Sequence, residues 1–251
     1  MCSVSWLIEE QGYQIFFNRD EQKTREKALP PRTLHMDDAK VLMPVDPVGQ
    51  GSWISTNDMG LSLCLLNNYQ AKNPKEALFS RGLLLKQLSK EGSVESVCEA
   101  FTRLTLPHFA PFILLAFDLD ICQGDKQVMA LEWNGLTSLI HEADSPLFSS
   151  GVDLDNVTQY RRGMFDSMVG GQPTPQELHA FHRQHHPDHP HMSVCMHRDD
   201  AETVSFTQVI VSEDSQKMLY VAGSPCQNLT SEALEQNVTS LPSRHSALAL
   251  A

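Results

Sequence analysis

The order in which strand-like and helix-like segments follow one another most constrains the fold of this chain. They come in blocks, running strands, helices, strands, helices, strands, with no βαβ alternation and no internal repeat. This order favours mainly antiparallel sheets with segregated helices, an α+β layered domain. The unbroken apolar run that starts "PFILLAF" at residues 111–117 is typical of a strand buried on both faces.

Strands are indicated by β-branched, aromatic or apolar residues between turn residues. At the start of the chain, residues 4–8 and 13–17 flank the turn-like "EEQG" and predict an antiparallel hairpin. Further strands are expected in "GSWIST", "GLSLCLLNNY", "VMALEW", "LTSLI", "ETVSFTQVIV" and "KMLYVAG". The polar, proline-bearing stretch 20–50 predicts a long connection, and residues 240–251 predict a flexible tail.

Helices are predicted over residues 80–88, 93–104 and 155–168 from apolar positions at helical spacing. The sequence "TPQE", residues 174–177, opens a fourth helix with a threonine cap, a proline in the first turn and a glutamate that completes a capping box. No linker divides the chain, and its 251 residues suffice for one large core. We therefore expect a single domain over residues 1–251.

Charge and cysteine usage exclude several classes of function. A net charge of −12 argues against nucleic acid and anionic membranes as partners, because both are bound mainly through Lys and Arg. The first apolar run, residues 4–8, is broken by two glutamates and follows no basic residue, so neither a signal peptide nor a membrane span is predicted. We expect a cytoplasmic protein. A homo-oligomer is compatible with this composition.

The six cysteines are scattered without a Cys-x-x-Cys pair, which favours reduced thiols over a disulfide framework or a zinc ribbon. Cys2 has a special place because it follows the initiating methionine. If Met1 is removed, Cys2 carries both a thiol and a free α-amine, whose reference pKa is about 7.7–8.0. The amine can then accept the thiol proton and later deliver it to a leaving amine. Nucleophile and base would thus stand on one residue.

The hairpin brings charged residues to the start of the chain. Its second strand ends "FFNRDE", and antiparallel pairing places that end beside the first strand's beginning. Asp20 is therefore expected near Cys2, where a carboxylate would orient and stabilise the α-ammonium. Arg19 would favour the thiolate by its charge or pair with a substrate carboxylate. The competing interpretation of residues 18–21 is a solvated hairpin exit.

The motifs "MCSVSWLI", "FFNRDE", "GSWIST" and "LLNNY", in this order, resemble the NRDE family that includes the transport-and-Golgi-organisation proteins. More distantly, the chain is similar to the group of choloylglycine hydrolase, penicillin V acylase and acyl-CoA:6-aminopenicillanic acid acyltransferase. Its later segments "LFSSGVDLDNVTQYRRGMF", "MSVCMHRDDAETVSFTQV" and "YVAGSPC" resemble the closing part of the acyltransferase-like members. The resemblance spans most of the chain and implies the four-layer αββα sandwich of N-terminal-nucleophile hydrolases.

The resemblance also implies roles for single residues. Cys2 matches the nucleophile and Asp20 the aspartate near its amine. Asn68, or failing that Asn67, matches the asparagine whose amide helps to form the oxyanion hole. Removing one oxyanion donor typically lowers the rate about 10²–10³-fold.

Three further residues of these motifs are candidates. Many amidases of the group have an arginine just before the Asn-x-Asp, where this chain has Phe17, while Arg19 sits between the two motif residues. The role of Arg19 as a catalytic residue therefore stays open. Asn18 and Trp53, together with Asn67, are assigned to substrate binding.

Arg161 lies on the apolar stripe of the helix expected over residues 155–168, where a charge is unfavourable unless it is paired or used. Pairing with a carboxylate is favoured over substrate binding, and both stay open. In "ETVSFTQ", alternation puts Thr203, Ser205 and Thr207 on one face. That face could look toward the catalytic strands or toward solvent.

Seven of the eleven histidines lie in "HAFHRQHHPDHPHMSVCMH". His182 and His186 are one helical turn apart, so a metal clip is conceivable, but no HExxH or paired-cysteine spacing supports it. We predict no metal and no cofactor. Cys64 and Cys195 lie in apolar strand-like segments and are expected to be buried structural thiols.

The prediction is a cysteine amidohydrolase that cleaves a small linear acyl amide through an acyl-thioester, with acyl transfer when an amine replaces water. The first alternative is a non-catalytic NRDE protein that binds a small ligand or takes part in lipid or haem handling. The second is a histidine-rich metal-binding module.

Overall fold

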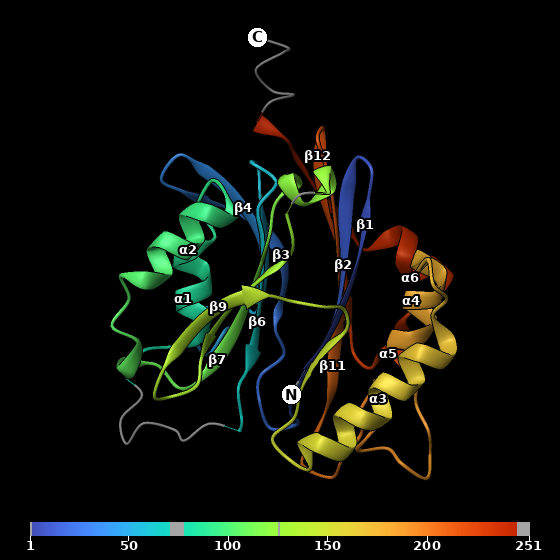
Figure 1. Cartoon of the computed structure of the whole chain (residues 1–251). Coiled ribbons are helices and arrows are strands. Elements are labelled where there is room, and N and C mark those ends of the chain that lie inside the picture. Colours follow the sequence, from blue (N-terminus) through green and yellow to red (C-terminus); the bar gives the residue numbers. More distant parts are fainter. Residues whose placement is uncertain (1, 71–77, 125, 245–251) are drawn as a thin grey trace.

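The computed structural model describes residues 2–70, 78–124 and 126–244. These residues form two antiparallel sheets packed face to face, with helices on both outer faces (Figure 1). The architecture is the expected αββα sandwich. Among the described residues, no helix combines the length and the apolar character needed to cross a membrane.

The first sheet contains the N-terminal hairpin and has six strands in the order β10-β1-β2-β11-β12-β13. Their bounds are β1 Cys2–Glu9, β2 Gly12–Gln22, β10 Leu147–Ser149, β11 Ala201–Ser212, β12 Ser215–Ala222 and β13 Val238–Pro242. The second sheet has seven strands in sequence order from β3 to β9. They are β3 Leu29–Met36, β4 Ala39–Val45, β5 Ile54–Asn57, β6 Ser62–Asn67, β7 Phe112–Phe117, β8 Met129–Trp133 and β9 Ser138–Glu142.

Helices form the outer layers (Figure 1). Those on the second sheet are α1 Arg81–Leu88 and α2 Val94–Thr102, and those on the first sheet are α3 Leu154–Met168, α4 Pro175–His182, α5 Pro225–Asn228 and α6 Ser231–Gln236. Two short 3-10 helices, η1 Leu106–His108 and η2 Leu119–Gln123, lie in connections. Thr174 caps α4 in a complete capping box with Glu177, as the sequence predicts.

Three apolar layers hold the sandwich together. The middle layer lies between the sheets and joins Val4, Ile15 and Phe17 of the first sheet to residues such as Leu115 of the second. The outer layers lie under the two groups of helices. Alternation along β7 sends Leu115 and Phe117 into the middle layer and Leu114 and Ala116 under α1 and α2. The predicted burial of this strand on both faces is therefore confirmed.

The structure corrects two expectations. Residues 20–50 are not a strandless connection, because β2 runs to Gln22 and β3 and β4 follow as a hairpin. β3 is an edge strand whose residues are largely exposed and include two prolines, so it carries no burial pattern to detect. Residues 240–242, expected in a flexible tail, are part of β13, which pairs with β12. Residues 245–251 lie outside the described residues.

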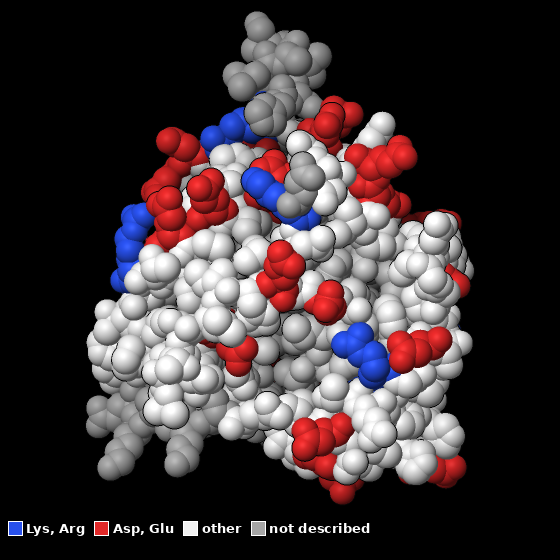
Figure 2. Space-filling view, viewed as in Figure 1, with Lys and Arg blue, Asp and Glu red and all other residues white. Residues whose placement is uncertain are grey.

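Acidic side chains gather over the upper end of the face in Figure 2, while basic ones on that face are few and scattered. This distribution agrees with the net charge of −12. In the same view, the N-terminal end of β1 lies at the lower end of the sandwich (Figure 1). Acidic side chains also lie at the lower edge of this face, so the negative charge is not confined to the end away from Cys2 (Figure 2).

A buried histidine joins α4 to the first sheet. The Nε2 atom of His182 lies 2.8 Å from the Ser5 hydroxyl, and its ring packs against Phe16 and Phe206. The side chain of Asn18 donates hydrogen bonds to the carbonyl oxygens of His182 and Val194, at 2.9 and 3.0 Å. Burial lowers the pKa of His182 to about 3, so this residue is neutral in the folded protein.

We expect this histidine to make the fold acid-sensitive. Below the ordinary histidine pKa of about 6.5, His182 becomes protonated in the unfolded chain. In the folded chain it stays neutral until the pH falls to about 3. The free energy of unfolding should therefore fall by about 1.4 kcal/mol per pH unit from this residue alone as the pH drops through that window. In urea titrations from pH 7 to 4, His182→Gln should have the shallower slope. The exposed control His191→Gln should keep the wild-type slope, and equal slopes in all three proteins would contradict the assignment.

Candidate active site

Cys2 lies at the first position of β1, between two strands of the first sheet. It is paired with Arg19 of β2 on one side and with Ser149 of β10 on the other. Its side chain is 8% exposed and belongs to the layer between the sheets. The thiol is therefore at the end of the central core.

A cavity of about 390 Å³ opens at this end of the sandwich. The first sheet and the loop after it contribute Cys2, Arg19, Asp20, Glu21 and Arg25, and the second sheet with its connections contributes Asp46, Gly49, Gly51, Ser52, Trp53, Leu65, Asn67, Phe79, Ser80, Arg81, Gly82 and Ala110. The two sheets thus meet at the thiol, which is the only cysteine that lines this cavity within the described parts of the chain.

One wall of the cavity depends on two glycines. Gly51 precedes Trp53, and Gly82 is in the first turn of α1. A Cβ atom on Gly51 would lie 2.3 Å from the carbonyl carbon of Gly82, so only glycine permits this approach. The backbone N–H of Ser52 donates to the Gly82 carbonyl at 3.1 Å, which fixes the start of α1 against the "GSW" segment.

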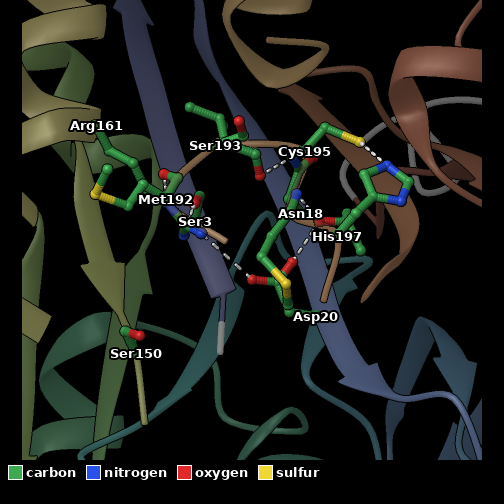
Figure 3. A network of polar contacts seen from close by, with 12 residues as sticks. Ser3, Asn18, Asp20, Ser150, Arg161, Met192, Ser193, Cys195 and His197 are labelled. Carbon is green, nitrogen blue, oxygen red and sulfur yellow. Dashed lines mark hydrogen bonds and ion pairs between the residues drawn. The ribbon is translucent and has the colours of Figure 1, made fainter. Parts of the chain in front are cut away.

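The Asp20 carboxylate is buried at the end of β2, on the helix-facing side of the sheet. Its Oδ1 accepts a hydrogen bond of 2.6 Å from the Thr203 hydroxyl. Its Oδ2 lies 3.8 Å from Nη2 of Arg161 and has no hydrogen-bond partner among the described residues. Figure 3 shows the carboxylate beside the end of β1, with Ser3 and Arg161 on one side and Asn18 on the other.

A β-bulge in β11 brings Thr203 to Asp20. Thr203 is opposite Asp20, but Ser205 is opposite Arg19, so Val204 is an extra residue in the ladder. The bulge turns Thr203 to the opposite face from Ser205 and Thr207. The expectation of one continuous hydroxyl face is therefore wrong, and all three residues are buried rather than on a solvent face.

Arg161 is a partner of Asp20 and does not line the cavity. The side chain is fully buried, and it donates to the Ser3 hydroxyl at 2.8 Å and to the Met192 carbonyl at 3.1 Å. Burial lowers the pKa of Arg161, while the charge of Asp20 acts against that shift. The assignment of Arg161 to substrate binding is corrected, because the side chain has no access to substrate; the carboxylate pairing is the role that the structure shows.

Arg19 shares the face of Cys2. Its guanidinium carbon lies 4.1 Å from the centre of the Trp53 ring, and its nitrogen atoms lie 3.2 Å from Glu21 and 3.7 Å from Asp46. A cation stacked on an aromatic face is held in one orientation. Arg19 and Trp53 therefore form a rigid part of the cavity wall next to the thiol.

The Cys2 thiol needs a base. Burial, as the largest cause, raises the pKa of Cys2, and the nearby charge of Asp20 raises it as well. The backbone N–H of Asp20 and the positive charge of Arg19 act in the opposite direction without cancelling the shift. The resting thiol is therefore protonated, and a nucleophilic reaction must begin with removal of its proton.

The two consecutive asparagines point to different places. The Asn68 amide donates to the Glu132 carboxylate at 2.8 Å and does not line the cavity. The Asn67 amide does line it, with one of its two N–H groups donated to the Tyr69 hydroxyl at 2.8 Å. The oxyanion candidate that the cavity lining supports is therefore Asn67 rather than Asn68, whose amide is engaged by Glu132.

Asn18 is also reassigned. It is fully buried on the helix-facing side of β2 and donates to the carbonyl oxygens of His182, at the end of α4, and of Val194, so it supports the fold and does not reach the cavity. Trp53 does reach it, with an indole N–H that has no partner among the described residues.

Sequence reasoning missed Arg81, Arg25 and Asp46 as cavity residues. Arg25 binds Asp46 at the cavity rim, with Nε 3.1 Å from the carboxylate. Arg81 donates to the Pro111 carbonyl at 2.9 Å, and burial lowers its pKa. The available signal was the position of Arg81 at the start of α1, where the helix dipole disfavours a cation.

The histidine-rich segment does not form the clip considered from its spacing. His182 is buried against Ser5, whereas His186 is near Asp188 at the surface. Within the described part of the chain, the one group of three candidate metal ligands is Cys195, His197 and Cys226. It lies outside the cavity of Cys2.

Comparison with solved structures finds proteins whose fold is similar to that of this chain. No protein-family model matches the chain, and no curated protein matches it in sequence. Among solved structures, an N-acylethanolamine-hydrolyzing acid amidase ortholog from Caenorhabditis elegans is 12% identical, with 96% of this chain and 100% of that chain covered at a TM-score of 0.55. A C2A mutant of the conjugated bile acid hydrolase from Clostridium perfringens is 13% identical, covering 96% and 92% at a TM-score of 0.53. The penicillin V acylase from Agrobacterium tumefaciens is 11% identical, covering 88% and 86% at a TM-score of 0.51. This chain therefore has a fold similar to theirs.

The buried pair of Asp20 and Arg161 yields a stability prediction. Arg161→Met leaves the buried carboxylate without its cation and should lower the free energy of unfolding by about 3–5 kcal/mol. Arg103→Met removes an exposed ion pair with Glu99 and should change the free energy by less than about 1 kcal/mol. Urea unfolding at pH 7 measures both. Adding Asp20→Asn to the first variant should restore part of the loss, and a single-variant loss no larger than that of the control would contradict the pairing.

Proposed function

We propose that this protein is a cysteine amidohydrolase of the N-terminal-nucleophile type, related to the NRDE-like members of that group. The observation that carries the proposal is the site around Cys2. Its thiol lines a cavity between the sheets, and the Asp20 carboxylate at the same strand end keeps one oxygen without a hydrogen-bond partner. The likeness of the fold to three amide-cleaving enzymes adds support.

The first step is proton transfer within one residue. With Met1 removed, the α-amine of Cys2 accepts the thiol proton, and the thiolate attacks the carbonyl carbon of the amide. Asp20 follows Arg19, the residue opposite Cys2 in the β1–β2 ladder, so its carboxylate is at the strand end where the processed chain would begin. The free Oδ2 of Asp20 then holds the ammonium in place.

The tetrahedral intermediate places negative charge on the former carbonyl oxygen. The second N–H of the Asn67 amide, the one not donated to Tyr69, is the donor for this oxygen. The α-ammonium gives its proton to the leaving amine as the C–N bond breaks, which leaves an acyl-thioester on Cys2. Water then attacks the thioester with the amine as base, releasing the acid; an acceptor amine in place of water gives acyl transfer.

The cavity wall favours a substrate with a polar or anionic part. Arg19 of β2 and Arg81 at the start of α1 line the cavity from opposite sides. Arg19 already faces Glu21 and Asp46, whereas the described hydrogen bond of Arg81 goes to a backbone carbonyl, which leaves its other N–H groups for an anionic group. Phe79 and Leu65 add apolar surface on the same wall. A small acyl amide that carries a carboxylate fits this arrangement.

The alternative is a member of the fold that binds a small ligand without turning it over. In that case Asp20 would serve only as the buried partner of Thr203 and Arg161, and no step would use the oxygen that lacks a hydrogen bond. The catalytic proposal gives this feature a role.

Processing and thiol reactivity test the proposal. We expect the purified protein to lack Met1 by intact mass, and to be alkylated first at Cys2 by a small chloroacetamide. Cys2→Ala should abolish both this labelling and the hydrolysis of any hit from a screen of N-acyl amides of varied chain length. Cys98→Ser, which changes a half-buried thiol outside the cavity, should leave both intact. If Met1 were retained, Cys2 would have no free α-amine to act as the base, and the mechanism would be contradicted.

The two asparagines provide a matched pair for the oxyanion step. Asn67→Ala should lower kcat about 10²–10³-fold with a smaller effect on KM, because the lost hydrogen bond forms in the transition state. Asn68→Ala should reduce kcat much less, since its amide contacts Glu132. Steady-state kinetics on the best amide from the screen measures both; equal losses would contradict the assignment.

A further inference from the structure

A second group of reactive side chains lies away from the cavity, next to the Asp20 network. It consists of Cys195 and His197, on the segment between α4 and β11, and Cys226 on α5. The Nε2 atom of His197 lies 3.3 Å from the Cys226 sulfur and 3.7 Å from the Cys195 sulfur, and one ligand atom from each residue lies within 4.8 Å of the others. Figure 3 shows the sulfur of Cys195 turned toward the His197 ring.

The backbone holds these side chains in place. Cys195 N–H donates to the Gln184 carbonyl at 2.8 Å and His197 N–H to the Pro190 carbonyl at 3.0 Å. Between them, Met196 is fully buried and its N–H donates to the Thr203 hydroxyl at 2.8 Å. Residues 195 and 197 therefore project to one side, as on a strand, while Met196 projects to the other. The site is formed before any ion arrives.

The distances match a tetrahedral thiolate–imidazole site. With zinc–sulfur bonds of about 2.3 Å and zinc–nitrogen bonds of about 2.0–2.1 Å, a tetrahedral ion separates a sulfur and a nitrogen ligand by about 3.6 Å. The observed separations of 3.3 and 3.7 Å bracket this value. A small rotation of the side chains would suffice to admit the ion.

The surroundings are those of a metal site rather than of three unrelated side chains. The other ring nitrogen of His197, Nδ1, lies 4.0 Å from the Glu202 carboxylate, which leaves Nε2 as the ligand atom. The backbone N–H of Cys226 points at the Cys195 sulfur at 3.4 Å and would stabilise a thiolate there. His185 is not part of this group, since its ring packs edge-on against that of His197 and its Nδ1 lies 3.1 Å from the Cys195 carbonyl oxygen, so a fourth ligand would be water.

We propose that Cys195, Cys226 and His197 bind one zinc ion, with water in the fourth position. Binding releases the two thiol protons to solvent, because only thiolates ligate zinc. The ion would link the segment before β11 to the short helix α5. The spacing, Cys-x-His followed by a single cysteine on a distant helix, matches no zinc motif, so the sequence pointed to no metal.

Metal titration of the full, reduced protein tests the proposal. We expect the apo protein in a phosphine reductant to bind one equivalent of Co²⁺ with a thiolate-to-cobalt absorption band, and Zn²⁺ to displace it. Cys226→Ser should weaken binding at least tenfold, and Glu202→Gln about tenfold through the orientation of His197. Cys98→Ser, a matched change at a half-buried thiol elsewhere, should leave binding unchanged. Cys2→Ala should also bind normally, which separates this site from the proposed function.

A second measurement needs no variant. Zn²⁺ should protect Cys195 and Cys226 of the native protein from slow alkylation while Cys98 and Cys122 react at the same rate with and without zinc. The proposal is overturned if the reduced wild type binds Co²⁺ no more tightly than Cys226→Ser. A pair that only forms a Cys195–Cys226 disulfide on oxidation and shows no zinc protection when reduced would overturn it as well.

Discussion

The buried carboxylate of Asp20 is the constraint on which the rest of the site depends. A carboxylate that is 5% exposed must be paired or hydrogen-bonded, and its two partners come from distant parts of the chain. Thr203 reaches it only because β11 bulges, and Arg161 only because α3 lies across the sheet. Ser3, the neighbour of Cys2, is bound to the same arginine. The position of the chain's first strand is thus tied to the charge that the proposed chemistry uses.

The two faces of the first sheet carry different kinds of residue. The face toward the second sheet carries Cys2 and Arg19 and looks into the cavity. The face toward the helices carries Asn18 and Asp20, which bind buried groups of the helical layer. A substitution on the helical side can therefore change the position of Cys2 without touching a substrate. Residues on the helix-facing side therefore act as positioning residues. A change in kcat or KM on substituting one of them must be compared with the change in the free energy of unfolding.

The segment between α4 and β11 connects this network to the proposed zinc site. It has little regular secondary structure, yet Val194, Cys195 and Met196 are fully buried. Its backbone N–H groups donate to Gln184 and Thr203, and the Val194 carbonyl accepts from Asn18. Because Thr203 binds both this segment and Asp20, an ion held by Cys195 and His197 would stiffen the support of Asp20 on the helix-facing side.

The local sequence pattern determined several elements of the fold of this protein. Periodicity and turn chemistry alone predicted the hairpin that pairs Cys2 with Arg19, the capping box of α4 and the strand buried on both faces, because each depends on residues near one another in sequence. Tertiary structure decided the rest. The β-bulge at Thr203, the choice of Asn67 over Asn68 and the meeting of Cys195 with Cys226 depend on how distant strands and helices register against each other. A single-residue shift in a strand reverses which side chains face a cavity, and no local signal in the chain carries that information.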